Sequence, residues 1–334
     1  MNRTLAAAAR ALQFACALLC AASPVHGRDT LKLATWNLEW LMTTETFDRL
    51  AGSCQREYAG AEGREIPCDI VEPEERSKRR APEDFTRLRD YAARLDADVI
   101  ALQEVDGAQA ERLVFPGHEF CFTRRDHVQN VGFAIRRGIP FRCADYTPLA
   151  LEPGGTRWGA DLTLFPGSGQ ELRLLSVHLK SGCPSQVLTN PREECVLLAA
   201  QVPVLERWID ARAREGVPFA VLGDFNRRLS RERHTARDRH GRLVAMWPEL
   251  DDADPPEADL TNATQGQPYR RCRPGDRYDA FIDHILLSRS LAERAVPGSF
   301  EQLTYDREDT RHAKLSDHCP IAVTVRLGEE KRDR

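Results

Sequence analysis

Several acidic, amide and imidazole side chains in this sequence stand at the ends of short apolar runs. Glu104 comes two residues after the apolar run 99–102, so its carboxylate is expected just beyond the end of a buried strand. A hard cation such as Mg²⁺ takes oxygen ligands and keeps several waters, so one or two carboxylates with an Asn amide can hold it. The alternative for a single glutamate in this position is an ordinary surface residue after a strand.

Asp224 and Asn226 follow the apolar run 219–222. Residues two apart on an extended segment face the same side. An aspartate and an asparagine on one side can together hold a water molecule and a phosphate oxygen. The alternative is a common Gly–Asp turn after a strand, although the string 221–226 is more specific than such a turn.

Two histidines are candidates for proton transfer. His318 follows Asp317, and Asp283 ends an apolar segment farther upstream. A carboxylate behind an imidazole selects one tautomer and raises its basicity, so Asp283 and His318 are expected to form a general-base pair. His178 is suited to protonate or stabilise a leaving oxygen. A single histidine on a strand is more often an ordinary core or surface residue, which is the alternative for each.

These side chains need rigid elements to hold them, and the chain supplies apolar runs typical of strands. The expected strands are residues 31–36, 99–102, 131–135, 161–165, 171–179, 219–222, 281–287 and 321–325. Apolar residues at helical spacing predict helices from Pro82 to Leu95 and over 194–214. Polar motifs at the ends of strands are where α/β proteins place ligand-binding groups.

The order of these elements favours two packed β-sheets with helices outside, because hairpins alternate with strands separated by helices. Segments 45–80 and 227–278 are polar and are expected to form loops. No linker divides the region 28–327, so we expect one domain there, followed by a charged tail at 328–334.

Composition excludes several classes of protein. The 334 residues are 42% hydrophobic and 29% charged with a net charge of −4, which excludes a disordered chain, a collagen and a multi-span membrane protein. No global basic excess exists, so any contact with nucleic acid must use a local patch. Residues 1–27 carry Arg3 and Arg10, then a short apolar stretch, which is typical of a secretory signal peptide. A membrane anchor is the alternative, but the uncharged stretch is too short to span.

Ten cysteines are present, and eight lie beyond the signal peptide. An even number in an exported chain indicates disulfides, although spacing does not determine their pairing. Free buried thiols and a zinc site are alternatives, but the chain has no Cys-x-x-Cys pair. We expect each cysteine to pair with its neighbour in sequence, giving Cys54–Cys68, Cys121–Cys143, Cys183–Cys195 and Cys272–Cys319.

Taken in order, these motifs resemble the endonuclease/exonuclease/phosphatase superfamily, which includes DNase I-like nucleases, over roughly residues 31–325. The chain looks like an exported, bacterial-type member. The resemblance implies a four-layer α/β/β/α sandwich of two mixed sheets and Mg²⁺-dependent hydrolysis of a phosphate ester, with Mn²⁺ or Ca²⁺ as other candidate ions. The residues matched to catalytic roles are His178, Asp224, Asn226, Asp283 and His318, and those matched to the metal site are Asn37, Glu104 and Asp317.

Two departures from the family pattern are evident. A further carboxylate usually supports the first histidine, and Asp161 is a weak candidate for that role. Position 284 is His where the family often has Tyr, which is either harmless or brings a third imidazole near the site.

Nucleic acid is the expected substrate, chiefly because of the family resemblance. Arg125 and Arg227 lie in basic clusters after motif strands, and Lys180 would share the face of His178 if that strand continued. Ordinary solvated side chains are the alternative for all three. A sphingomyelinase-like phospholipid phosphodiesterase or a phosphatase is the alternative function, and a binding module without catalysis is a third. We expect a periplasmic or extracellular monomer without stable membrane insertion.

Overall fold

The computed structural model describes residues 29–58, 63–151, 156–232, 235–276 and 278–328. The expected signal peptide at 1–27 lies outside these residues, as does the expected tail at 328–334 except for its first residue.

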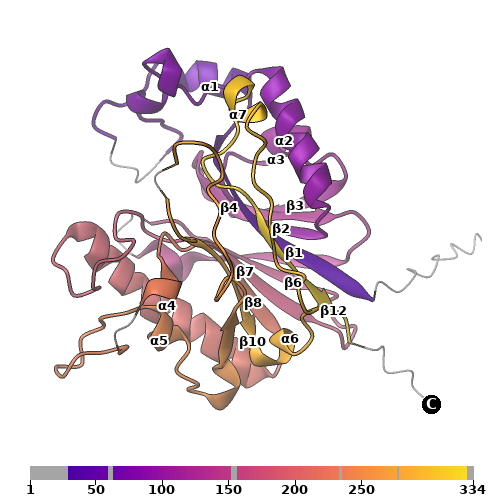
Figure 1. Cartoon of the computed structure of the whole chain (residues 1–334), viewed down its shortest axis with the longest axis vertical. Helices are drawn as coiled ribbons and strands as arrows, with labels where there is room; N and C mark the ends of the chain where they lie inside the picture. The colour runs from indigo at the N-terminus through magenta and orange to yellow at the C-terminus, as the bar shows by residue number, and fades with distance from the viewer. Residues whose placement is uncertain (1–28, 59–62, 152–155, 233–234, 277, 329–334) are drawn as a thin grey trace, which may run out of the picture.

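Two six-stranded sheets form the centre of the molecule (Figure 1). The first sheet has the order β11 (Glu301–Gln302), β12 (Ile321–Arg326), β1 (Thr30–Leu41), β2 (Val99–Val105), β4 (Asn130–Arg136) and β3 (His118–Phe122). The second has the order β5 (Phe141–Tyr146), β6 (Gly159–Leu164), β7 (Leu172–His178), β8 (Phe219–Asp224), β10 (Asp283–Ser288) and β9 (Leu260–Asn262). Both sheets are mixed, because β1–β2 and β7–β8 are parallel while their other strand pairs are antiparallel.

Helices lie on the outer side of each sheet (Figure 1). The first group is α1 (Thr44–Ala51), α2 (Pro82–Leu95), α3 (Ala108–Val114) and α7 (Asp309–His312). The second group is α4 (Glu193–Glu215) and α5 (Trp247–Leu250), whereas the short α6 (Arg289–Ala292) follows β10 and packs its Leu291 into the cluster between the sheets. This arrangement confirms the expected four-layer α/β/β/α sandwich.

Three apolar layers hold the sandwich together, because the side chains of each strand alternate between its two faces. Between the sheets, Leu33 of β1 packs in one cluster with Leu222 of β8. On the outer face of the first sheet, Trp36 of β1 packs with Leu88 of α2. On the outer face of the second, a separate cluster joins α4 to β7 and β8. Both faces of each sheet are therefore buried, which accounts for the near-continuous apolar runs in the sequence.

The strand ends that carry the polar motifs meet at one edge of the sandwich. β1 and β2 run parallel, so the motifs at their carboxyl ends lie side by side, and the same holds for β7 and β8. β10 runs antiparallel to β8, and its first residue, Asp283, is paired with Asp224, the last residue of β8. Elements far apart in the sequence thus bring the motifs together.

Several elements differ from the expectations. Segment 45–80 contains α1, a short amphipathic helix whose Phe47 is buried, and segment 227–278 contains α5 and β9. The edge strands β3 and β5 were not expected, because their exposed positions break the apolar pattern that marks a buried strand. The strand expected at 281–287 begins at Asp283.

All four expected disulfides are present, namely Cys54–Cys68, Cys121–Cys143, Cys183–Cys195 and Cys272–Cys319. Within the residues described, no helix has both the length and the apolar character needed to cross a membrane.

Candidate active site

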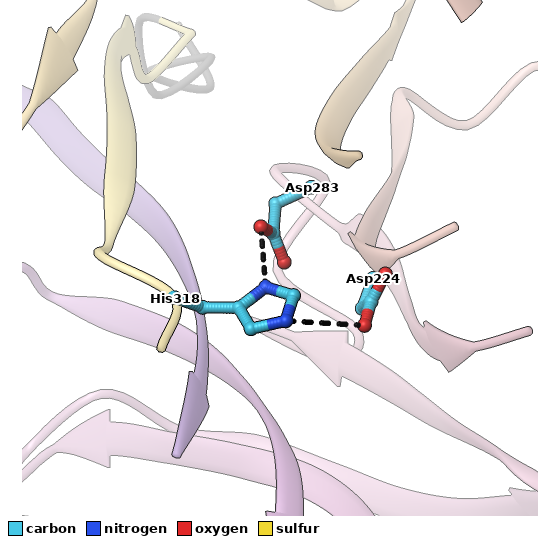
Figure 2. A group of neighbouring side chains, drawn as sticks. All are labelled: Asp224, Asp283 and His318. Atoms are coloured by element: carbon cyan, nitrogen blue, oxygen red, sulfur yellow. Dashed lines mark hydrogen bonds and ion pairs between the residues drawn. The ribbon is translucent and has the colours of Figure 1, made fainter. Parts of the chain in front are cut away.

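His318 and Asp283 form a buried pair at the meeting edge of the sheets (Figure 2). Nδ1 of His318 lies 2.7 Å from Oδ2 of Asp283. Ser316 holds the backbone of this loop, because its hydroxyl accepts from the backbone N–H of His318 at 3.1 Å and donates to the carbonyl of Asn37 at 2.7 Å. The pair is therefore locked in position from both the β1 and β10 sides.

The electrostatics of this pair are those of a base with a carboxylate behind it. Burial acts to lower the pKa of His318, but the negative charges of Asp283 and Asp224 outweigh it and raise that pKa well above its usual value. Nε2 of His318 faces away from Asp283 and lies 3.9 Å from Oδ2 of Asp224 (Figure 2). Burial, with Asp283 adding repulsion and His318 opposing it, raises the pKa of Asp224 to about 7.

Glu104 occupies a bulge near the end of β2. The pairing between β2 and β4 shifts register between Gln103 and Val105, and Glu104 adopts a left-handed φ of 57°. Bulges next to active sites re-aim side chains, and the extra residue here turns Glu104 toward the second sheet. Its Oε1 lies 3.8 Å from Nε2 of His178, which ends β7.

Asn37 contacts the carboxylates as a donor. Its Nδ2 group donates to Oε1 of Glu104 at 3.3 Å and to Oδ2 of Asp224 at 3.1 Å. Its Oδ1 accepts from the backbone N–H of Glu39 at 3.0 Å. In this structure the amide oxygen of Asn37 accepts from the backbone and its nitrogen faces the site, so its role as a metal ligand stays a prediction. Asn37 positions Glu104 and Asp224.

His178 lies between the carboxylates of Glu104 and Asp224. Its Nε2 is 3.5 Å from Oδ2 of Asp224, and burial lowers its pKa well below the usual value. No described residue forms a hydrogen bond with its buried Nδ1. Asp161 is not the carboxylate that supports His178, because it accepts hydrogen bonds from Arg173 and from the indole of Trp208, each within 2.9 Å.

Asp224 and Asn226 are close together for a reason other than strand alternation. β8 ends at Asp224, and Asn226 has a left-handed φ of 53°, so the segment is not extended. The backbone N–H of Asn226 donates to Oδ1 of Asp224 at 2.7 Å, and its Nδ2 donates to the carbonyl of Leu179 at 3.0 Å. A tight turn, rather than a shared strand face, aligns the two side chains.

Asp317 lies beside the base, with Oδ1 3.9 Å from Nε2 of His318. Its backbone N–H donates to Oε2 of Glu39 at 3.1 Å. Burial and then the charge of Asp317 raise the pKa of Glu39, while Lys78 acts to lower it. The structure thus adds Glu39, which the sequence reasoning missed, as the residue that anchors Asp317.

The donor set fits a divalent cation. Glu104, Asp224, Asp283 and Asp317 converge here, and their ion-pair partners are the imidazoles of the site. A hard, oxygen-seeking cation would offset this negative charge. Ligand atoms of Asp224, Asp283 and His318 lie within 4.8 Å of one another. Because Nδ1 of His318 already bonds Asp283, that trio fits acid–base chemistry better, and Glu104 is the stronger candidate ligand.

Arg227 does not face substrate, and the strand argument for Lys180 does not apply. Arg227 is 2% exposed, and its guanidinium bonds Oε1 of Glu232 at 2.7 Å and the carbonyls of Cys183 and Gln186. It is a structural residue, so its assignment to substrate is corrected. β7 ends at His178, so the shared-face argument for Lys180 does not hold; its Nζ lies 3.4 Å from the carbonyl of Ser181.

Arg125 stays a predicted substrate contact. Burial raises the pKa of the Tyr58 phenol, and the charges of Arg157 and Arg125 act to lower it. His284 does not join the site, because its Nε2 bonds the carbonyl of Arg227 at 2.8 Å and its ring is fully buried.

Several supporting residues carried no recognisable signal in the sequence. Arg80 is buried and donates to carbonyls on both the β1 end and the segment before His318, namely those of Leu38, Glu39, Trp40, Lys314 and Leu315. Gln129 donates to Glu104, and Arg157 donates to Gln129. Arg80 belongs to a charged run, which is typical of a solvated surface. Arg157 lies in no motif that indicates a function. The position of Gln129 just before an expected strand was the only available cue.

The sequence profile of the Endonuclease/Exonuclease/phosphatase family matches residues 34–318. This match includes all the clustered side chains described above. The chain belongs to the endonuclease/exonuclease/phosphatase family. Members are metal-dependent phosphoric ester hydrolases, including nucleases and phosphodiesterases, so this chain is an enzyme of that class. A search of curated proteins finds no match.

Solved structures of family members share the fold at low sequence identity. The human Nocturnin catalytic domain with bound sulfate is 15% identical, with 90% of this chain and 96% of that chain covered and a TM-score of 0.54. Danio rerio TDP2 complexed with a single-strand DNA product is 18% identical, with 89% and 99% covered and a TM-score of 0.52. A Bacteroides thetaiotaomicron family protein is 14% identical, with 90% and 98% covered and a TM-score of 0.51.

Proposed function

We propose that this family member is an exported, Mg²⁺-dependent nuclease that hydrolyses phosphodiester bonds of DNA or RNA by in-line attack of water. The observation that carries the proposal is the buried His318–Asp283 pair, in which Nε2 of His318 points away from Asp283 toward the carboxylate of Asp224 (Figure 2). A base aimed at a cation-binding pocket is the arrangement that activates water against a phosphate ester.

Each residue has a step in this mechanism. His318 would take the proton from the attacking water at Nε2 when a bound divalent cation offsets the carboxylate charges that raise its pKa, while Asp283 holds the ring and stabilises the imidazolium that forms. Asp224 and Asn226 orient the water and the phosphate oxygens. His178, whose Nε2 contacts the same oxygen of Asp224, assists the departure of the leaving oxygen. A divalent cation held by Glu104 would neutralise the charge that develops on the phosphate.

The surface favours a nucleic acid over a membrane lipid. An enzyme that works on a lipid surface needs an exposed apolar element rich in aromatics. Among the described residues, the exposed large hydrophobic side chains are Leu113 and Val196, and neither is aromatic. The TDP2 structure named above is a complex with a single-strand DNA product, which is a substrate precedent within this fold.

The four disulfides support export to the periplasm or beyond, where disulfides persist. We further propose a single catalytic domain over 28–327 that acts as a monomer. Mg²⁺ is the proposed ion because the site is rich in oxygen donors, with Mn²⁺ or Ca²⁺ as substitutes.

The test is nicking of supercoiled plasmid by the mature protein with its disulfides intact, in Mg²⁺ at a concentration of about 5 mM, chosen for a weakly held, water-rich ion. Nicking that is abolished by EDTA and by Glu104→Ala and His318→Ala establishes a metal-dependent endonuclease. A plasmid left intact, with turnover of linear DNA or RNA, indicates an exonuclease. Turnover of sphingomyelin or a small phosphate monoester alone overturns the proposal in favour of the lipid or phosphatase alternative.

A further inference from the structure

Two hydrogen bonds in series connect Arg157 to Glu104 through Gln129. Nη2 of Arg157 donates to Oε1 of Gln129 at 2.8 Å, and Nε2 of Gln129 donates to Oε2 of Glu104 at 2.8 Å. The other oxygen of Glu104 accepts from Asn37 at 3.3 Å. Each carboxylate oxygen of Glu104 is therefore held by one amide N–H.

The direction of the Gln129 amide is decisive. An amide has a donor end and an acceptor end, and only one orientation turns its donor end toward Glu104. The guanidinium of Arg157 has donors only, so it can bond only the oxygen end of the Gln129 amide. This excludes the flipped orientation of that amide. A flipped amide would place its oxygen against the carboxylate of Glu104 and its nitrogen against Arg157.

The backbone at Gln129 is fixed as well. Its N–H donates to Nδ1 of His127 at 2.9 Å, and the side chain is 5% exposed. Burial, followed by the charge of Arg125, lowers the pKa of His127 to about 3, so this nitrogen stays available as an acceptor. Nε2 of His127 then carries the hydrogen and lies 3.2 Å from the hydroxyl of Tyr58.

A neutral amide between a cation and a metal-binding carboxylate has a specific consequence. A guanidinium placed directly on Glu104 would compensate its charge and compete with a metal ion. Arg157 fixes the orientation of the Gln129 amide, and that amide fixes the carboxylate of Glu104. Because Gln129 is neutral, the negative charge of Glu104 stays available to a metal ion. Hydrogen-bond partners of metal-ligating carboxylates tune affinity in this way.

We propose that Gln129 and Arg157 are positioning residues that orient Glu104 for the divalent cation, with Arg157 acting through the amide of Gln129. This inference rests on the proposed function, because it requires the cation to bind at Glu104. It predicts that the two residues control metal affinity jointly rather than independently.

The experiment measures Mn²⁺ binding to the full mature chain by isothermal titration calorimetry, without substrate. Gln129→Met keeps the length of the side chain but removes the amide, and it should weaken Mn²⁺ binding by about 10- to 100-fold. Arg157→Leu should weaken binding within the same range. The double variant should bind no more weakly than Gln129→Met, because Arg157 acts through that amide. Arg142→Leu is the matched control, since Arg142 is 70% exposed and lies 3.6 Å from Glu171 at a distant edge strand; its affinity should equal wild type.

Two conservative variants protect the test against misfolding. Arg157→Lys keeps a cationic donor and should retain more affinity than Arg157→Leu, and Gln129→Asn keeps the amide on a shorter stem. Circular dichroism confirms that each variant is folded before titration.

The outcomes separate this inference from the function on which it rests. If Glu104→Gln abolishes Mn²⁺ binding while Gln129→Met and Arg157→Leu bind normally, the positioning role is wrong and the proposed metal site stands. If Glu104→Gln itself binds Mn²⁺ normally, the cation lies elsewhere and both proposals fail. If the loss of Mn²⁺ affinity in Arg157→Leu adds to that of Gln129→Met in the double variant, Arg157 acts independently of the amide, and its proposed action through Gln129 is wrong.

Discussion

Replacing Asp283 with Asn tests the base assignment most directly. Asp283 and His318 are both buried, and their side chains are joined by a hydrogen bond of 2.7 Å. Asp283→Asn preserves the shape of the side chain but removes its charge, which is needed when His318 becomes positively charged during proton transfer. Substrate contacts are untouched, so the change should lower kcat and leave KM near its wild-type value.

The size of the effect follows from the kind of bond that is lost. A hydrogen bond to a charged group is worth about 1.5–3 kcal/mol. Loss of about 2–3 kcal/mol of transition-state stabilisation lowers kcat by about 30- to 150-fold, since each 1.36 kcal/mol is a factor of ten. Removing the base itself in His318→Ala should cost on the order of 10² to 10⁴.

The assay is a full cycle of single and double variants under saturating substrate and metal. Asp283→Asn should have little further effect in the His318→Ala background, because the two residues act as a unit. Asp48→Asn serves as the control, since Asp48 is exposed and paired with Arg79. If Asp283→Asn lowers kcat equally with and without His318, Asp283 acts independently, for example as a metal ligand, and the dyad is refuted.

Three further predictions concern metal, pH and disulfides. Glu104→Ala should abolish stimulation by Mg²⁺, and retention of the full wild-type metal response would contradict the assignment. Burial, with Asp210 adding repulsion, raises the pKa of Glu206 to about 8, so between its ordinary pKa of 4.5 and about 8 the folded chain holds a proton that the unfolded chain has lost. The contribution of Glu206 to stability therefore falls as pH rises through that window. Glu206→Gln should raise Tm at pH 8 more than at pH 5, and equal Tm shifts at the two pH values would exclude this effect of Glu206. Removing the Cys272–Cys319 disulfide, which spans 47 residues, should reduce the free energy of unfolding by about 4 kcal/mol and lower kcat, because Cys319 follows His318. Unchanged turnover after reduction with dithiothreitol would disprove the second effect.

Much of the site was visible in the sequence because local rules apply at strand ends. An apolar run followed by a polar residue places that residue at an open edge, and this rule located Glu104, His178 and Asp224. The disulfide pairs were expected only as neighbours in sequence, and the structure confirms them, although spacing alone does not determine such a pairing. The four-layer fold followed from the resemblance and from the alternation of hairpins with helices.

Side-chain partners from distant segments were decided only by the tertiary structure. The sequence around Arg227 is typical of a surface cation. The fold buries Arg227 against Glu232 and two carbonyls, so its charge is paired inside the protein. The bulge at Glu104 likewise depends on the pairing of β2 with β4, and Asn226 donates to the carbonyl of Leu179, 47 residues away in sequence. Arg157 reaches Gln129 across 28 residues of sequence. Local sequence specifies which residues end strands, but a hydrogen bond between distant segments exists only after both have packed. The sequence therefore determined which groups could perform the chemistry, and the packing decided which of them are held in place to perform it.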